Sequence, residues 1–435
     1  MADAIRADGA QLNTSLRDRT IRKLNMRIVL FCFICFIVNY LDRVNIGFAA
    51  LHMNEDIGLT PYMFGLGAGI FFIGYLAFEI PSNMILHKVG PRIWIARIMV
   101  TWGIVSCAMA FVQGPTSFYI LRFLLGVAEA GFAPGVLLYL TYWFPAKERG
   151  RATALFMAAT VLSIVIGAPI SGWLIDAGEG LFGLHGWQAM FILEGLPAVL
   201  LGIITFFYLV DSPQKDSKWL DADERAWLLE QLAADEKNAQ PDTRHSLREI
   251  FSDFRVWLLT LVYMFNGIAV YGVIMWLPQI VKTFGLTTLQ SGFVSAIPFI
   301  FAALGLVVIS RSSDRTGERK IHTAIAGLFG GLFLAASALA PNPYLGLLLL
   351  CICAFFLWSY LGVFWTLPTQ FLTGAAAAGG LAAINGFAQI GGFTGPYIVG
   401  WVKTATDSFS ISLLVLAVFP IISFFLCMSL KAKRD

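Results

Sequence analysis

The stretch Asn39–Gly47, NYLDRVNIG, places Asp42 and Arg43 side by side inside a run that otherwise reads as hydrocarbon. The surrounding segment 28–50 has about the length of a membrane-spanning helix, and its first half is entirely apolar. A charged residue at the centre of such a helix costs about 2.5–3.5 kcal/mol, so adjacent opposite charges must face protein or water. We expect this stretch to form part of a functional site, with a neutralised structural pair near the helix end as the alternative.

The composition places the whole chain in a membrane. Hydrophobic residues make up 58% of the 435 residues, charged residues make up 13%, and the mean hydropathy is +0.74. A chain of this composition cannot cover a soluble globule with polar surface. The sequence therefore predicts an integral membrane protein with an all-α fold.

Twelve apolar runs are long enough to cross a bilayer as helices. Residues 1–26 are polar and basic, unlike a cleavable signal peptide, so the first span is expected to direct insertion. The twelve spans are expected near 28–50, 62–86, 93–112, 116–142, 152–175, 188–210, 256–281, 289–310, 322–340, 344–366, 376–402 and 410–430.

The basic residues indicate how these spans are oriented. With twelve spans, 26 of the 30 Lys and Arg residues fall on one side of the membrane, while Arg43 and Arg122 fall within spans. Basic segments remain in the cytoplasm during insertion. Both termini are therefore expected in the cytoplasm, and moving the count by one span would destroy the bias.

A polar central stretch divides the spans into two groups of six. The apolar residues between Trp219 and Leu232 lie roughly on one helical face, which predicts a short amphipathic helix at the membrane surface rather than a catalytic domain. The expected organisation is a cytoplasmic segment (1–27), a six-helix bundle (28–210), a cytoplasmic linker with the amphipathic helix (211–255), a second six-helix bundle (256–430) and a cytoplasmic tail (431–435).

Two loops indicate that the halves are structural repeats. The second span is followed by His87–Arg92 (HKVGPR) and the eighth by Asp314–Lys320 (DRTGERK), and aligning Gly90 with Gly317 gives an offset of 227 residues. The same offset aligns the charged residues within the first-half spans with uncharged residues of the second half. The two halves are thus expected to share architecture, with the ionic chemistry concentrated in the first.

The fourth span carries two more charges, Arg122 and Glu129. Seven residues are two helical turns, so both side chains are expected on one face, about 10 Å apart along the axis. Gly126, Gly131 and Gly135 make the helix thin enough to approach another closely. This pattern favours the wall of a polar cavity, and a buried ion pair that only sets helix register is the alternative.

Two further acids lie within spans. Glu79 precedes Pro81 in the second span, and Glu194 lies about two turns into the sixth. Each is expected to have a structural role, bonding a neighbouring helix or lying near water, with a functional role as the alternative.

The placement of cysteine and histidine argues against a cofactor. Cys32 and Cys35 form a C-F-I-C sequence inside an apolar run, which favours helix packing over a redox or zinc pair. The histidines fall in predicted loops or at span ends. We expect no metal, haem or other cofactor, and no enzyme active site within the bilayer.

Several motifs together resemble those of one family. They are LDRVNIGFA (41–49), GAGIFFIGYLAFEIPSN (67–83), RFLLGVAEAGFAPG (122–135), YWFPAKERGRA (142–152) and MFILEGLPA (190–198). In combination they resemble the anion:cation symporter family of the major facilitator superfamily, and the Gly317 loop resembles the signature loop of that superfamily. The stretch VFWTLPTQFLTGAAAAGG (363–380) is similar to bacterial permeases for tartrate, phthalate, rhamnonate and related carboxylates.

The resemblance implies roles for individual residues. It implies twelve helices in two pseudo-symmetric bundles and a location in the bacterial inner membrane. It further implies substrate binding by Arg43, Tyr40, Tyr75, Trp365, Thr366 and Asn385, proton coupling by Asp42 and Glu129, and ion pairing or gating by Arg122, Asp314 and Arg315.

The residues themselves indicate a mechanism. The sequence contains no Gly-x-x-x-x-Gly-Lys-Ser/Thr motif, so transport must be driven by a coupled gradient. Arg43 remains charged and presents a forked partner for a carboxylate, while Asp42 and Glu129 can carry protons. We expect proton-coupled uptake of a small organic anion by alternating access, with an exchanger, an exporter or a transporter-derived ligand sensor as alternatives.

The expected partners are a small organic anion, protons and the lipid bilayer, and no nucleic acid. The aromatic residues near the second-half site allow either an aromatic acid or a hydroxylated sugar acid. Because the fold buries its own core, the chain is expected to act as a monomer.

Overall fold

The computed structural model describes residues 15–215, 219–238, 253–371 and 374–430, and these are helical with short connections and no β-strand among them. Three predicted regions lie wholly or partly outside the described residues. They are the first part of the N-terminal segment (1–14), parts of the linker (216–218 and 239–252) and the tail (431–435).

The helices of the first half begin after a helical stretch at residues 15–24. They are η1 (Asn25–Val29), α2 (Leu30–Asp56), α3 (Pro61–Val89), α4 (Pro91–Ala108), η2 (Met109–Phe111), α5 (Pro115–Glu129), α6 (Phe132–Trp143), α7 (Ala146–Met157), α8 (Ala159–Gly178), η3 (Leu181–Gly183) and α9 (Gly186–Tyr208). The linker holds α10 (Ala222–Asn238), and the second half holds α12 (Phe254–Lys282), α13 (Thr288–Thr316), α14 (Arg319–Ala338), α15 (Pro343–Phe364), α16 (Pro368–Phe371), α17 (Gly374–Thr406) and α18 (Phe409–Ser429).

Local sequence explains where several helices begin. Five of them start with proline (Pro61, Pro91, Pro115, Pro343 and Pro368), which lacks an N–H that the first turn would leave unpaired anyway. The Asn342 side chain also caps α15 by accepting a hydrogen bond from the Leu345 N–H at 2.9 Å.

The number of spans agrees with the sequence. In the described part of the chain, eleven helical segments are long and apolar enough to cross a membrane. The twelfth predicted span, 376–402, falls on α17. The prediction of an all-α integral membrane fold with two pseudo-symmetric halves is confirmed.

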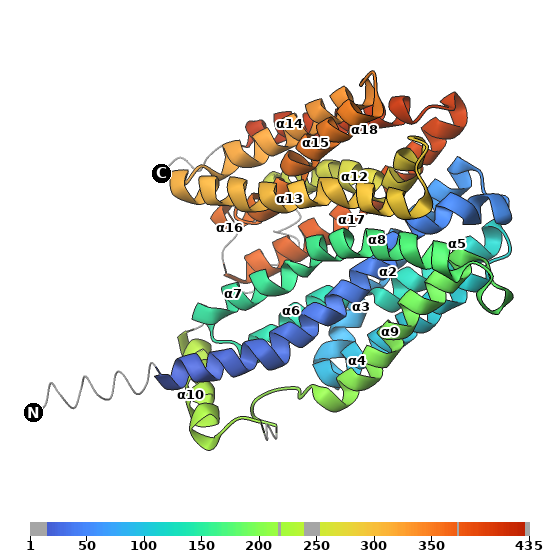
Figure 1. Ribbon diagram of the computed structural model, residues 1–435. Coiled ribbons are helices and arrows are strands. Elements are labelled where there is room, and N and C mark those ends of the chain that lie inside the picture. Colours follow the sequence, from blue (N-terminus) through green and yellow to red (C-terminus); the bar gives the residue numbers. More distant parts are fainter. Residues whose placement is uncertain (1–14, 216–218, 239–252, 372–373, 431–435) are drawn as a thin grey trace, which may run out of the picture.

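Figure 1 shows the two halves as separate groups of helices, blue to green and yellow to red. In the first bundle (α2 to α9), α4 packs on α9, α3 on α5, and α2 on both α8 and α9. In the second bundle (α12 to α18), α12 packs on α17 and α18, and α13 and α14 pack on α15. The bundles meet where α3 packs on α17, α8 on α13 and α2 on α12.

The bundles touch toward the end of the molecule opposite α10. There Phe64 meets Trp276 edge to face with ring centroids 4.9 Å apart, and His52 Nε2 lies 3.1 Å from Thr288 Oγ1. α10 lies at the other end, which we call the linker end and which also holds the first described residues (Figure 1). Among the described residues, the hydrogen bonds and ring contacts between the bundles extend toward the linker end as far as Glu79 on α3 and Asn385 on α17.

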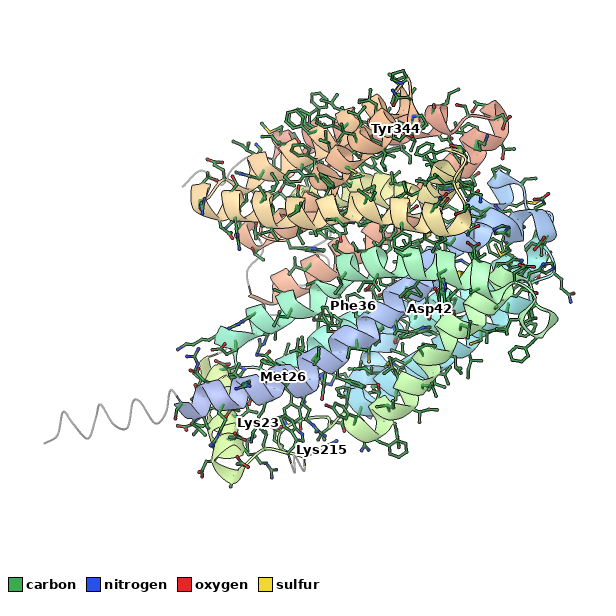
Figure 2. All side chains as sticks on the ribbon, in the orientation of Figure 1. Lys23, Met26, Phe36, Asp42, Lys215 and Tyr344 are labelled. Atoms are coloured by element: carbon green, nitrogen blue, oxygen red, sulfur yellow. The ribbon has the colours of Figure 1, made fainter. Side chains whose placement is uncertain are left out.

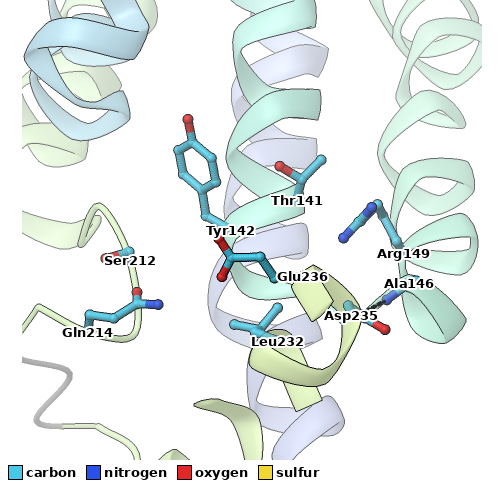
Figure 3. Close-up of a pocket in the computed structure, with 9 residues that line it drawn as sticks. All are labelled: Thr141, Tyr142, Ala146, Arg149, Ser212, Gln214, Leu232, Asp235 and Glu236. Atoms are coloured by element: carbon cyan, nitrogen blue, oxygen red, sulfur yellow. Dashed lines mark hydrogen bonds between the residues drawn. The ribbon is translucent and has the colours of Figure 1, made fainter. Parts of the chain in front are cut away.

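At the linker end, α10 packs under the first bundle. The rings of Trp143 and Trp219 lie 5.3 Å apart, and Lys23 donates to Glu224 at 2.8 Å. Figure 2 shows Lys23 and Lys215 at this end and Asp42 much deeper along α2. A cavity of about 870 Å³ opens here (Figure 3) and is lined by Thr141, Tyr142, Ala146, Arg149, Ser212, Gln214, Leu232, Asp235 and Glu236. These residues come from α6, α7, α10 and the start of the linker, so the cavity is separate from the stretch containing Asp42.

Candidate functional site

Asp42 and Arg43 project into different environments. Adjacent helical residues point about 100° apart, so α2 directs Asp42 toward α4 and Arg43 toward α3 and α5. Both side chains are buried, with residue exposures of 1% and 8%. The two charges that are neighbours in sequence therefore do not pair with each other.

Arg43 forms its ion pair with Glu129. The guanidinium Nη2 of Arg43 donates to Glu129 Oε1, joining α2 to α5, and both side chains are shielded from solvent. The sequence predicts Arg122 and Glu129 on one face of a helix, two turns apart. In the structure, the arginine that pairs with Glu129 is Arg43, which lies on another helix.

The helix carrying Glu129 ends at that residue. Ala130 is extended, Gly131 has a φ of +89°, and α6 begins at Phe132, so the predicted span 116–142 consists of two helices. A Cβ at Gly131 would collide with Ser82 on α3, and the positive φ disfavours other residues. An interrupted helix at mid-membrane is a common way to expose polar groups to a substrate.

Aromatic rings surround the Arg43 guanidinium. Its Cζ lies 5.4 Å from the ring centroid of Tyr40 and 5.3 Å from those of Phe71 and Tyr75. Such rings stabilise a desolvated cation. Among the described residues, neither Arg43 Nε nor Glu129 Oε2 has a hydrogen-bond partner. The pair thus retains one donor and one acceptor for a further polar group.

Arg122 is fully buried beside this pair. Its Nε donates to the carbonyl of Gly67 at 3.3 Å and its Nη2 to that of Ala68 at 3.2 Å, while its Cζ lies 4.9 Å from the Phe71 ring. Arg122 and Arg43 therefore both contact Phe71, and Arg122 holds α5 to α3 through backbone carbonyls.

Asp42 faces the interior of the first bundle. Trp102 Nε1 donates to Asp42 Oδ2 at 2.8 Å, and Ser106 Oγ donates to Oδ1 at 2.9 Å, both from α4. These neutral donors were not singled out from the sequence. A tryptophan and a serine one turn apart in an apolar span were the available signal, but packing explains such a pair equally well.

The second-half candidates lie in three settings. Asn385 on α17 donates to Glu79 on α3 at 3.1 Å, which joins the two bundles. The Trp365 ring packs 5.0 Å from that of Tyr263. The Thr366 hydroxyl bonds the Val363 carbonyl of its own helix at 2.7 Å. Of these three contacts, the one made by Asn385 crosses to the first bundle.

The gating candidates Asp314 and Arg315 are exposed at the linker end of α13. Asp314 accepts a hydrogen bond from Arg319 Nη1 at 2.5 Å, across the turn that Gly317 makes with a φ of +73°. The corresponding Gly90 also has a positive φ, 100°, but its ψ of 147° differs from the −6° of Gly317, so the aligned glycines make different turns.

The arrangement suits ionic recognition rather than metal chemistry. In the described residues no group of three or more His, Cys, Asp or Glu side chains is placed to hold a metal ion. Arg43 and Glu129 neutralise each other, so protonation of the acid would leave the arginine free to bind a carboxylate.

Comparisons with known proteins agree with this fold. Residues 32–396 match the family model of the Major Facilitator Superfamily. The "Putative tartrate transporter" of Agrobacterium vitis is 51% identical over 92% of this chain and 92% of its own length. The "Quinolone resistance transporter" of Acinetobacter baumannii is 42% identical over 95% of each chain. A crystal structure of a D-xylose-proton symporter shares the fold, with a TM-score of 0.76 and 15% identity over 94% of this chain and 98% of that chain.

Proposed function

The chain belongs to the major facilitator superfamily, whose members are membrane transporters and not enzymes, and on that premise we propose that it imports a small organic carboxylate together with protons. The name of the Agrobacterium vitis relative makes tartrate the first compound to try. We further propose that the linker end faces the cytoplasm, that the protein resides in the inner membrane, and that it acts as a monomer.

The observation that carries this proposal is the buried pair of Arg43 and Glu129. An arginine cannot release its proton under physiological conditions, so only Glu129 can change the charge of the pair. A substrate carboxylate can replace Glu129 on the guanidinium once Glu129 is protonated. Proton and anion then enter the same site with opposite charges, which keeps the occupied site neutral in a low-dielectric environment.

The remaining steps follow from the bundle arrangement. The contacts between bundles lie toward the end opposite α10, so this conformation corresponds to a carrier closed on the outside. Protonation of Glu129 from outside requires these contacts to open. Binding of the anion then favours closure of these contacts on the outer side of the site. Rocking of the bundles exposes the site to the cytoplasm.

Uptake into proteoliposomes tests the proposal. Purified protein should accumulate labelled tartrate when the outside is more acidic than the lumen, and a protonophore should abolish the accumulation. Counterflow without a pH gradient should persist, because exchange needs no net proton movement. Counterflow that a pH gradient never converts into accumulation would indicate an exchanger.

The relative named for quinolone resistance supports a second candidate function, export of an organic compound. The same proteoliposome assay distinguishes import of a carboxylate from export of a drug. An importer with the proposed coupling accumulates tartrate on the acid-outside gradient, whereas a proton-coupled drug exporter moves a fluoroquinolone toward the acidic side and ignores tartrate.

A further inference from the structure

Two acids, Asp42 on α2 and Glu194 on α9, lie near each other inside the first bundle. Glu194 on α9 is 4% exposed, and its carboxylate accepts hydrogen bonds from Ser171 Oγ at 2.7 Å and from Asn45 Nδ2 at 2.9 Å. The same Asn45 Nδ2 lies 3.5 Å from Asp42 Oδ1, at the outer limit for a hydrogen bond. One amide on α2 therefore lies between two buried carboxyl groups.

The surroundings of this pair are neutral. Its hydrogen-bond partners from the packed helices are Asn45 on α2, Trp102 and Ser106 on α4, and Ser171 on α8. Cys107 on α4 is a further titratable group near Asp42, and its thiol donates to the Ile192 carbonyl at 3.7 Å. The nearby charges on another face of α2, Arg43 and Glu129, are paired with each other.

Electrostatics limits the charge that such a cluster can hold. An ionised carboxyl buried without a cationic partner is costly, and two in one low-dielectric cluster also repel each other. When two acids interact in this way, they lose their protons in steps that belong to the pair. Asp42 and Glu194 thus have the arrangement of two carboxyls that retain one proton between them.

The hydrogen-bond partners of the two acids differ, and the difference favours Glu194 as the acid that holds the shared proton. Trp102 can only donate, so Asp42 Oδ2 is best matched in its unprotonated form. Ser171 and Asn45 can each donate or accept. Asn45 Oδ1 lacks a partner among the described residues, and turning the amide by 180° would present that oxygen to the O–H of a protonated Glu194.

We propose that Glu194 is a further proton-binding residue of this carrier, which shares one proton with Asp42 through the contact at Asn45. The inference rests on the proposed proton-coupled function. Asp42 and Asn45 flank Arg43 on α2, so a change of charge at Glu194 acts on the helix that positions the substrate-binding arginine.

Two substitutions at Glu194 distinguish a proton site from a structural hydrogen bond. Glu194→Gln keeps the side-chain length and can still bond Ser171 and Asn45, but it cannot bind a proton. Glu194→Asp is too short for both bonds, yet it can bind a proton. We expect the Gln variant to retain tartrate counterflow and lose accumulation on a pH gradient, and the Asp variant to retain more accumulation than Gln.

The control is Glu236→Gln, which removes an exposed carboxylate on α10 and should behave like the wild type. Accumulation by Glu194→Gln at the wild-type level, or above that of Glu194→Asp, overturns the inference, because a structural role predicts that order. A wild-type protein that exchanges tartrate but ignores the pH gradient contradicts the proposed function itself.

Infrared spectroscopy supplies a readout independent of transport. The C=O stretch of a protonated carboxylic acid should be present in the wild type at neutral pH and lost or reduced in Glu194→Gln. If the Gln variant does not fold, Glu194→Asp takes its place and should shift the same band. A band left unchanged by the folded variant assigns the proton to another acid and overturns the inference.

Discussion

Arg43 and Glu129 form an ion pair between the middle of α2 and the last residue of α5. The pair is shielded from solvent, and each member retains an atom without a hydrogen-bond partner among the described residues. Breaking one partner of a buried pair leaves an uncompensated charge, which is costly unless another ion replaces it. Substitutions at Arg43, at Glu129 and at the helix break beside Glu129 should therefore each have a distinct effect.

Arg43→Lys should weaken carboxylate binding. Lysine keeps the charge but cannot present two parallel N–H groups to a carboxylate, so we expect a loss of about 1.5–3 kcal/mol in binding free energy. Ligand-induced thermal shifts or calorimetry with tartrate would measure it. Wild-type affinity in a folded Arg43→Ala variant would remove this residue from the binding site.

Glu129→Gln should separate exchange from accumulation. The substitution mimics the protonated acid permanently and leaves Arg43 free for substrate, so binding and counterflow should persist while pH-driven accumulation is lost. Asp42→Asn is the matched variant, because it neutralises the other candidate proton-coupling acid. If Asp42→Asn abolishes accumulation and Glu129→Gln does not, the roles of the two acids are reversed; if both accumulate normally, proton coupling through them is wrong.

Gly131→Ala should destabilise the protein more than Gly180→Ala. Both glycines have positive φ, +89° and +78°, which costs a residue with a Cβ about 1–2 kcal/mol. A Cβ at Gly131 would also collide with Ser82, whereas nothing lies within 4 Å of one at Gly180. Overpacking adds about 1–3 kcal/mol at the first position only. Equal thermal unfolding temperatures for the two variants in detergent would show that the interrupted helix tolerates a side chain.

Cross-linking the outer ends of the bundles should stop transport. His52 and Thr288 contact each other across the bundle interface, so His52→Cys with Thr288→Cys should be joined by a short thiol cross-linker. Transport should fall and return after cleavage of the linker, because substrate entry requires this contact to open. Each single-cysteine variant treated in the same way is the control. Full activity in the cross-linked protein would rule out opening at this interface.

Cysteine labelling in intact cells should confirm the orientation. A membrane-impermeant thiol reagent should reach cysteines introduced at the exposed positions of His52 and Asn342 and fail at those of Lys88, Lys147 and Arg315. Permeabilised cells provide the control for reactivity at the last three. External labelling at position 147 would contradict the twelve-span topology.

The sequence by itself determined the class of fold, because apolar length and basic-residue bias follow directly from the physics of the bilayer. Eleven of the twelve expected spans agree with helices in the described residues, and α17 covers the position of the twelfth. The sequence also indicated that Asp42, Arg43, Arg122 and Glu129 are buried within spans, since charges in such runs must face protein.

Only the tertiary structure decided which buried charges meet. Helical spacing relates residues on one helix, but it contains no information about the rotation of α2 against α4 and α5. The structure pairs Arg43 with Glu129, gives Asp42 the neutral donors Trp102 and Ser106, and ends α5 at Glu129. Such choices arise from packing between helices distant in sequence, where a rotation of one residue, about 100°, would send each charge to a different partner.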